Sequence, residues 1–219
     1  MDTFEALTKF YSNYDEEGRL LSKHGQVEFL TTMRYIEKYL QPGMRILEIG
    51  AATGRYSHYF AQQGYQVDAV ELVEHNIEIF KQNTTLDESV TITQGNAMDL
   101  SLFDDNTYDI TLLLGPMYHL FTTEDKLKAL SEAIRVTKKN GIVFAAYCMG
   151  NASILSYGFI RGEIYNIIEK CMLNTETFDT FSNPWDIFEL HRKEDIDRLR
   201  SEFNVTQLIS LPPMAIQTT

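Results

Sequence analysis

The chain has 219 residues, of which 44% are hydrophobic and 12% aromatic, and this composition suits a single domain with a sizeable core. Its net charge of −12 at pH 7 argues against duplex DNA or bulk RNA as the substrate, because phosphate backbones are bound mainly by Lys and Arg. No apolar stretch reaches about 18 residues and no signal peptide is evident, so we expect a cytoplasmic protein without a membrane span.

The cysteines and histidines give no indication of a metal site. Cys148 and Cys171 form no C-x-x-C pair, and Cys148 lies in an apolar stretch that predicts a core position. The histidines other than His119 are not spaced as metal ligands usually are. They are His24, His58, His75 and His191. The sequence therefore predicts no bound metal.

Residues 1–40 are predicted to form an N-terminal helical cap. A first short helix is indicated by apolar residues at near-helical spacing, which are Phe4, Leu7, Phe10 and Tyr11. This helix either packs on the edge of the core or forms a lid over a ligand, with Tyr14 or Arg19 touching it. A second helix over 25–40 is indicated by one apolar stripe that consists of Phe29, Met33, Ile36 and Leu40.

The stretch 45–56, RILEIGAATGRY, organises the chain. Ile46, Leu47 and Ile49 predict a buried strand over 44–49, Gly50 and Gly54 break it, and a helical pattern follows. A dinucleotide fingerprint starting at Gly50 would need a small residue where Arg55 stands.

The alternative pattern is acidic-x-Gly-x-Gly-x-Gly, which is matched by Glu48, Gly50, Ala52 and Gly54 with one Gly replaced by Ala. In this stretch the chain resembles the Rossmann-like (class I) S-adenosylmethionine (SAM) dependent methyltransferases. The resemblance implies SAM as the cofactor, with these four residues around its methionine part. The methyl group of Ala52 is expected to narrow the cleft and to affect affinity.

Glu71 ends a predicted strand over 66–72 and lies 23 residues after Glu48. An acid about 20 residues past such a loop is placed to hydrogen-bond a ribose diol, because a carboxylate accepts from both hydroxyls. We therefore assign Glu71 to the ribose.

The segment after the predicted strand 90–93 is expected to line the adenine. In the resembled family a Gly-Asp-Ala type of segment lies here, and this chain has Asn96, Ala97 and Met98. Asn96 can accept from the adenine amino group through its amide oxygen. Asp99 is a second candidate for that contact, and a role as a cap or turn residue is equally open for it.

The predicted strand 108–114 leads into Gly-Pro-Met-Tyr-His, which resembles small-molecule methyltransferases at the same place. Ligands of doubly wound folds lie beyond the carboxyl ends of the strands, so this exit faces the methyl acceptor. By resemblance the carbonyl of Leu114 faces an amino group and Tyr118 shapes the pocket. His119 is the candidate catalytic base, and the alternative is a hydrogen-bonded wall residue.

The second half of the chain carries weaker signals. We predict a helix from about 127 to 139 with Asn140-Gly141 as its turn, a strand over 142–148 and a helix over 159–173. Residues 174–192 are aromatic, and by resemblance they cover the acceptor pocket, to which Trp185 is assigned; a satellite hydrophobic cluster is the alternative. A helix over 193–203 and a strand over 205–209 follow, and no seventh strand is evident because Pro212-Pro213 cannot pair within a central strand.

Together these elements predict one α/β methyltransferase domain over 1–219, a doubly wound and mainly parallel sheet with helices on both faces. It comprises the cap 1–40, a SAM-binding core 41–150, an acceptor-side insert 151–192 and a C-terminal part 193–219. The predicted function is transfer of the SAM methyl group to a small-molecule acceptor. A nicotinamide-dependent oxidoreductase and a non-enzymatic SAM-binding regulatory protein are the alternatives. The acceptor and the oligomeric state cannot be inferred from the sequence.

Overall fold

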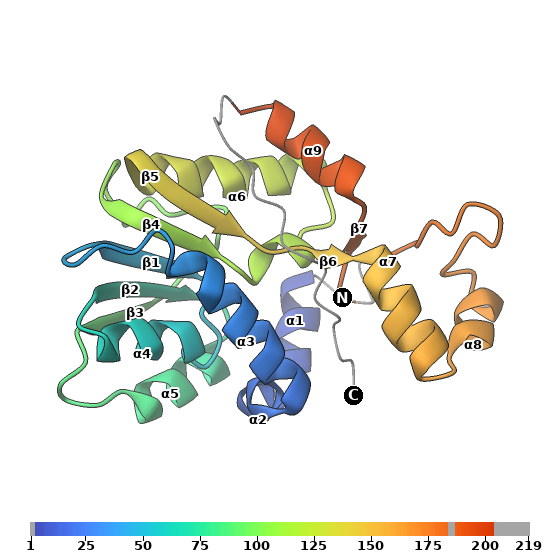
Figure 1. Cartoon of the computed structure of the whole chain (residues 1–219), viewed down its shortest axis with the longest axis horizontal. Coiled ribbons are helices and arrows are strands. Elements are labelled where there is room, and N and C mark those ends of the chain that lie inside the picture. The colour runs from blue at the N-terminus through green and yellow to red at the C-terminus, as the bar shows by residue number, and fades with distance from the viewer. Residues whose placement is uncertain (1–2, 184–186, 204–219) are drawn as a thin grey trace. The chain divides into compact units, whose positions relative to one another are not determined.

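The computed structural model describes residues 3–183 and 187–203, and the chain divides into two compact units. The first unit comprises Met1–Met117 and Lys128–Ala146, and the second comprises Tyr118–Leu127 and Tyr147–Thr219. Figure 1 gives the labels of the helices and strands. The predicted single domain and its internal boundaries stay a prediction.

The first unit is built on a five-stranded sheet in the order β3-β2-β1-β4-β5, in which every pair is parallel. Its strands are β1 (Arg45–Ile49), β2 (Gln66–Glu71), β3 (Val90–Gln94), β4 (Tyr108–Leu113) and β5 (Thr137–Ala145). The chain runs outward from β1 on one side and returns to β4 on the other, so the strand order reverses between β1 and β4. This reversal places a ligand crevice beyond the carboxyl ends of these two strands.

Helices lie on both faces of this sheet, as the sequence predicted (Figure 1). One face is covered by α3 (Lys23–Ile36) and α4 (Arg55–Gln62), whose buried side chains pack with β1, β2 and β4 in one core cluster. On the same face α5 (Glu74–Asn83) buries Phe80 against Ala69 of β2. The later turns of α6 (Thr123–Val136) lie on the other face and bury Ala129, Ala133 and Val136. The predicted fold class is confirmed.

The N-terminal part holds one helix more than predicted. The short helix α1 (Thr3–Tyr11) is confirmed, and α3 buries the predicted Phe29, Met33 and Ile36. However, α3 ends at Ile36, so the predicted end at Leu40 is wrong. The additional helix α2 (Glu16–Leu21) has only six residues, too few for an apolar period, and the carboxylate of Asp15 caps it by accepting from the Gly18 N–H at 2.8 Å.

The predicted end of the helix before β5 is also wrong. Helix α6 stops at Val136 and β5 begins at once, because the hydroxyl of Thr137 donates to the Ala133 carbonyl at 2.6 Å and contacts the Thr111 hydroxyl at 2.6 Å. Asn140 does adopt the expected left-handed conformation, with φ 72°, but within an irregular part of β5.

The second unit contains a two-stranded parallel sheet, β6 (Cys148–Met149) with β7 (Leu190–His191). The strand predicted over 142–148 is therefore two strands, although Cys148 is buried as expected. The helix predicted over 159–173 is wrong, since Gly162, with φ 79°, separates a π-helix from the next helix. The remaining elements are the 3₁₀ turn η1 (Pro116–Tyr118), which spans the boundary between the units, α7 (Gly150–Ser153), the π-helix η2 (Ile154–Ile160), α8 (Ile164–Glu169) and α9 (Lys193–Ser201).

Two further predictions meet the limits of the described chain. The helix predicted over 193–203 corresponds to α9, whereas the strand predicted over 205–209 lies outside the described residues. In the ranges 3–183 and 187–203, no helix has the length and apolar character needed to cross a membrane.

Candidate functional site

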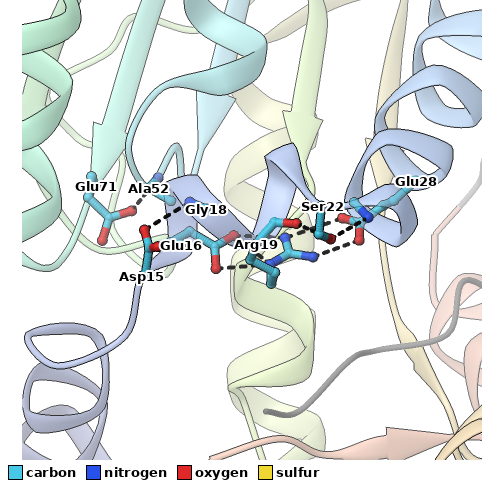
Figure 2. A network of polar contacts seen from close by, with 9 residues as sticks. Asp15, Glu16, Gly18, Arg19, Ser22, Glu28, Ala52 and Glu71 are labelled. Carbon is cyan, nitrogen blue, oxygen red and sulfur yellow. Dashed lines mark hydrogen bonds and ion pairs between the residues drawn. The ribbon is translucent and has the colours of Figure 1, made fainter.

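The glycine loop between β1 and α4 turns through three left-handed residues. Gly50, Ala52 and Gly54 have φ values of 75°, 48° and 92°. The N–H groups of Gly50 and Ala51 donate to the Val70 carbonyl at 2.8 and 3.0 Å, and the Ala52 N–H donates to the Glu71 carboxylate at 2.8 Å (Figure 2). Because these amides are used within the protein, the loop offers space and carbonyl groups to a ligand more than N–H donors.

The loops that follow β1 and β4 are in close contact. A Cβ atom on Gly50 would lie 2.7 Å from Cδ of Pro116, and one on Gly115 would lie 3.2 Å from the Gly50 carbonyl oxygen. A Cβ atom on Gly54 would lie 2.6 Å from Nε2 of His58. Only glycine fits at Gly50 without moving a neighbour, and the two loops together form the base of the crevice.

Glu48 is buried on β1, with 2% of its surface exposed, and it accepts from the Ser57 hydroxyl on the first turns of α4. Burial raises the pKa of its carboxyl to about 8, although the hydroxyl and the N–H of Ser57 favour the charged form. A pyrophosphate would bind at this helix N-terminus. The carboxyl of Glu48 already interacts with it, so the arrangement does not suit a dinucleotide.

Glu71 ends β2 and binds the glycine loop. Its carboxylate accepts from the Ala52 N–H at 2.8 Å, from the Val73 N–H at 2.9 Å and from the Asn76 side chain at 3.3 Å. Burial raises its pKa despite these bonds. Each carboxylate oxygen has two lone pairs, so Oε2, which accepts from Ala52, retains an acceptor position. The ribose assignment of Glu71 stays a prediction that this geometry permits.

Arg19 lies on α2 beside the loop and is bound by two acids (Figure 2). Its guanidinium donates to Glu16 at 2.7 Å and to Glu28 of α3 at 2.7 Å. Burial raises the pKa of Glu16, and the charge of Glu71 adds to this shift, which places α2 near the end of β2. Tyr14 stacks on Phe10 at 4.9 Å. The predicted ligand contacts of Tyr14 and Arg19 remain predictions, and Arg19 has strong partners within the protein.

The predicted adenine segment forms a tight turn after β3. The Asn96 amide oxygen accepts from the Met98 N–H at 2.9 Å, and the Asp99 carboxylate accepts from the Ser101 N–H at 3.1 Å. Ala97 is buried, and Leu114 packs against the core cluster between α3, α4 and the sheet. Asp99 thus has the turn role that was left open, and the adenine contacts of Asn96, Ala97, Met98 and Leu114 stay predictions.

The predicted base, His119, belongs to the second unit. Its Nδ1 lies 2.9 Å from the Ile187 carbonyl oxygen, and burial lowers the pKa of the imidazole to about 4. The ring is therefore neutral near pH 7, and only a protonated Nδ1 can donate to a carbonyl, so Nε2 is the basic nitrogen. The rings of Tyr118 and Phe188 lie 4.7 and 5.2 Å from it. Trp185 lies outside the described residues.

Sequence reasoning did not identify Ser57 and Glu16 as partners of the predicted site. The i, i+3 spacing of Glu16 and Arg19 on α2 was the available signal for their ion pair. For Ser57 the signal was its place in the first turn after the glycine loop. Neither signal indicates which residues, distant in the sequence, the side chains of Glu16 and Ser57 would contact.

Comparison with known proteins relates the glycine loop and the sheet to methyltransferases, over less than half of the chain. Residues 47–145 match the family model described as "Methyltransferase domain". A demethylmenaquinone methyltransferase from Clavibacter sepedonicus is 32% identical over 132 residues, which are 59% of this chain and 51% of that protein. A ubiquinone biosynthesis O-methyltransferase from Rickettsia typhi is 24% identical over 199 residues, 89% of this chain and 77% of that protein.

The chain thus spans about half the length of the first curated relatives that it matches, at 52% and 51%. Among solved structures, it superposes on Haemonchus contortus phosphoethanolamine N-methyltransferase 1, which was crystallised with phosphoethanolamine and S-adenosylhomocysteine. The TM-score is 0.63 at 18% identity, and the match covers 91% of this chain and 40% of that one. At this identity the likeness supports the fold.

Proposed function

We propose that this chain transfers a methyl group from SAM to a small-molecule acceptor, because residues 47–145 match the family model described as "Methyltransferase domain". The proposal includes SAM as the donor, bound beyond the carboxyl ends of β1, β2 and β4. The neighbour from Haemonchus contortus, which was crystallised with S-adenosylhomocysteine, supports this choice of donor.

The observation that carries the proposal is the position of Glu48. A dinucleotide needs free N–H groups and a positive helix end for its pyrophosphate. Here the carboxyl of Glu48 interacts with the start of α4, and the Ala52 N–H is bonded to Glu71. A sulfonium donor carries no phosphate and needs no such anion site, so this arrangement admits it. This disfavours the nicotinamide-dependent alternative.

The residues of the first unit would hold the donor. Glu71 would accept from the ribose hydroxyls through Oε2, and the left-handed turn at Gly50, Ala52 and Gly54 would leave room for the methionine part. Asn96, Ala97, Met98 and Leu114 would surround the adenine. SAM supplies an activated methyl group, so the protein acts mainly by aligning acceptor and methyl carbon and by excluding water.

His119 would serve as a weak base at most. Its Nε2 is the basic nitrogen, but the imidazole has a pKa of about 4. It therefore has little affinity for a proton of the acceptor at neutral pH. An acceptor that ionises easily, or an amine that attacks without a base, suits such a site. The matched relatives are named for menaquinone and ubiquinone methylation, which makes phenolic ring compounds the first acceptors to test.

The test is calorimetric titration of the whole chain with SAM, S-adenosylhomocysteine and NAD. We expect a Kd for SAM of about 1–100 μM, equivalent to about 5–8 kcal/mol, and no binding of NAD. Glu71→Gln should weaken SAM at least tenfold, whereas the exposed Glu74→Gln on α5 should not. Binding of NAD without SAM would overturn the proposal.

Enzymatic activity needs a second measurement. Labelled SAM is incubated with the protein and a panel of phenols, catechols and amines, and transfer of the methyl label is counted. Tight SAM binding without transfer to any acceptor would favour the non-enzymatic SAM-binding alternative.

A further inference from the structure

The second unit contains a cavity of about 160 Å³ that the proposed methyl transfer does not use. It lies between the first turns of α6, the strand β7 and helix α9. Its floor and walls are formed by Lys126, Leu127, Glu189, His191, Arg198 and Leu199. A water molecule occupies about 30 Å³ in the liquid, so this volume holds a small organic molecule.

His191 lines this cavity with two weakly partnered ring nitrogens. The residue is only 3% exposed, and among the described residues neither nitrogen has a well-aligned hydrogen bond, although the backbones of Cys148 and Glu189 lie near enough to favour the charged ring. Its ring packs edge-on against Tyr147 at 5.1 Å, and pairing of β7 with β6 fixes its backbone. Burial, aided by the charge of Lys126, lowers the pKa of the ring to about 4, so it presents one N–H donor and one acceptor.

Lys126 places a buried cation next to this imidazole. The residue is 5% exposed, and its ammonium pairs with Oε2 of Glu189, which lies 3.6 Å from Nε2 of His191. An ammonium has three N–H donors, and one carboxylate oxygen does not satisfy all three. The Lys126 ammonium therefore keeps N–H donors that the Oε2 atom of Glu189 does not satisfy, and a buried ligand with an acceptor oxygen would satisfy them.

The apolar surface and the charges of the cavity lining restrict the class of ligand that fits it. Leu127 and Leu199 provide apolar surface, and Arg198 adds a second cation at the open side. Asp195 and Glu202 also line the rim, so that with Glu189 the lining has three carboxylates and two cations and would repel a multiply charged anion such as phosphate most strongly. Among the described residues, no three His, Cys, Asp or Glu side chains are grouped to hold a metal.

We propose that this cavity is a binding site for a small monocarboxylate with a compact apolar body. Its carboxylate accepts from Lys126 and from the N–H of His191, and its apolar body lies between Leu127 and Leu199. Arg198 contributes attraction from the rim. The ligand is distinct from the methyl donor, and the site stands whether or not the proposed methyl transfer is correct.

The probe is isobutyrate, titrated into the whole chain while the ring nitrogens of the histidines are followed by ¹⁵N NMR. The His191 signals are assigned with His191→Phe, which keeps a ring against Tyr147. We expect saturable shifts of the His191 nitrogens with a Kd of about 1–10 mM, the range of a ligand of this size. Isobutylamine, which has the same apolar body and the opposite charge, should produce no such shift.

Variants on and off the cavity distinguish the site from weak surface binding. His191→Phe and Lys126→Met should each weaken isobutyrate at least tenfold, as measured by calorimetry on protein whose folding is verified by circular dichroism. Lys128→Met on the same helix and His24→Phe in the first unit are the matched controls, and both should bind as the parent does.

Three results would overturn the proposal. They are the absence of saturable binding to the folded parent protein, equal binding of the amine, and unchanged affinity in folded His191→Phe. SAM titrations of the same variants keep the two proposals separate, since loss of isobutyrate binding with normal SAM binding concerns the cavity alone.

Discussion

Burial shifts the pKa values of titratable groups in opposite directions in the two units. The first unit buries the carboxyls of Glu16, Glu48 and Glu71, and the pKa of each is raised. The second unit buries the imidazoles of His119 and His191, and the pKa of each is lowered to about 4. The largest contribution is the same in all five, because burial disfavours the charged form of any group. The first unit thus holds carboxyls that keep their protons to higher pH than usual, and the second unit holds neutral imidazoles that acid would charge.

The largest expected effect of a single group is on the first unit as the pH rises from about 5 to 8. Glu48 binds its proton up to a folded pKa of about 8, whereas its ordinary value is 4.5. Stability from this group is therefore present below pH 4.5 and is lost as the pH rises toward 8, by about 5 kcal/mol in total. Urea unfolding between pH 5 and 8 should show this slope, and Glu48→Gln should flatten it.

The matched control for that prediction is Glu74→Gln on α5, which removes an exposed carboxyl. Its pH dependence should follow the parent. An equally steep loss of stability between pH 5 and 8 in Glu48→Gln would show that another group is responsible and would weaken the contrast between the units.

The second effect is on the second unit at acid pH. His119 and His191 have lowered pKa values, so their contribution to stability is present above about pH 6.5 and is lost as the pH falls toward 4. Each accounts for about 3 kcal/mol. Hydrogen exchange between pH 7 and 5, corrected for the intrinsic rate, should show peptides around β6 and β7 opening before those of the parallel sheet.

His191→Phe should remove about half of that acid sensitivity, and His24→Phe, an exposed histidine of the first unit, should remove none. If the peptides of both units opened together as the pH fell, the two units would share one cooperative transition and the contrast would be lost.

The third effect is on α2. Arg19→Met leaves the carboxylates of Glu16 and Glu28 without their cation in a setting where Glu16 is 8% exposed. Breaking a mostly buried pair from one side costs about 2–3 kcal/mol at this degree of exposure. Faster exchange of the α2 amides should report it, and Glu16→Gln in the same background should restore part of the loss.

The smallest effect is at Ala52. With φ 48°, its side chain lies in a conformation that favours glycine, and Ala52→Gly should relieve about 1 kcal/mol of strain, partly offset by the entropy of the unfolded chain. Thermal unfolding and a SAM titration would measure both consequences. A loss of stability above about 1 kcal/mol would mean that the Ala52 methyl group contributes packing that outweighs the strain.

The sequence predicted the sheet better than it predicted the second unit, and the reason is physical. The alternation of apolar strands and amphipathic helices up to Ala145 is set by local periods that can be read residue by residue. At the end of α6, the Thr137 hydroxyl donates to the Ala133 carbonyl and contacts the Thr111 hydroxyl. Thr111 is far from Thr137 in the sequence. No local pattern reveals such a partner.

The candidate site shows the same limit. The positions of Glu48, Glu71 and the glycine loop followed from their spacing, and the structure brings them together in the first unit. The partners of these groups were not predictable, since Ser57, Ala52 and Arg19 act through contacts that only the folded chain defines. His119 was expected to be a catalytic base or a wall residue, and the burial that lowers the pKa of its imidazole has no signature in its neighbours along the chain.

The crowding of Gly50 against Pro116 also bears on how such a chain can evolve. Any side chain at Gly50 would meet the Pro116 ring at 2.7 Å, and Gly115 is held 3.2 Å from the carbonyl of Gly50. A substitution at Gly50 becomes tolerable only after the loop at 115–116 has changed, so the order of mutations matters. The two loops form an epistatic pair, and the paths to a different donor would have to pass through both.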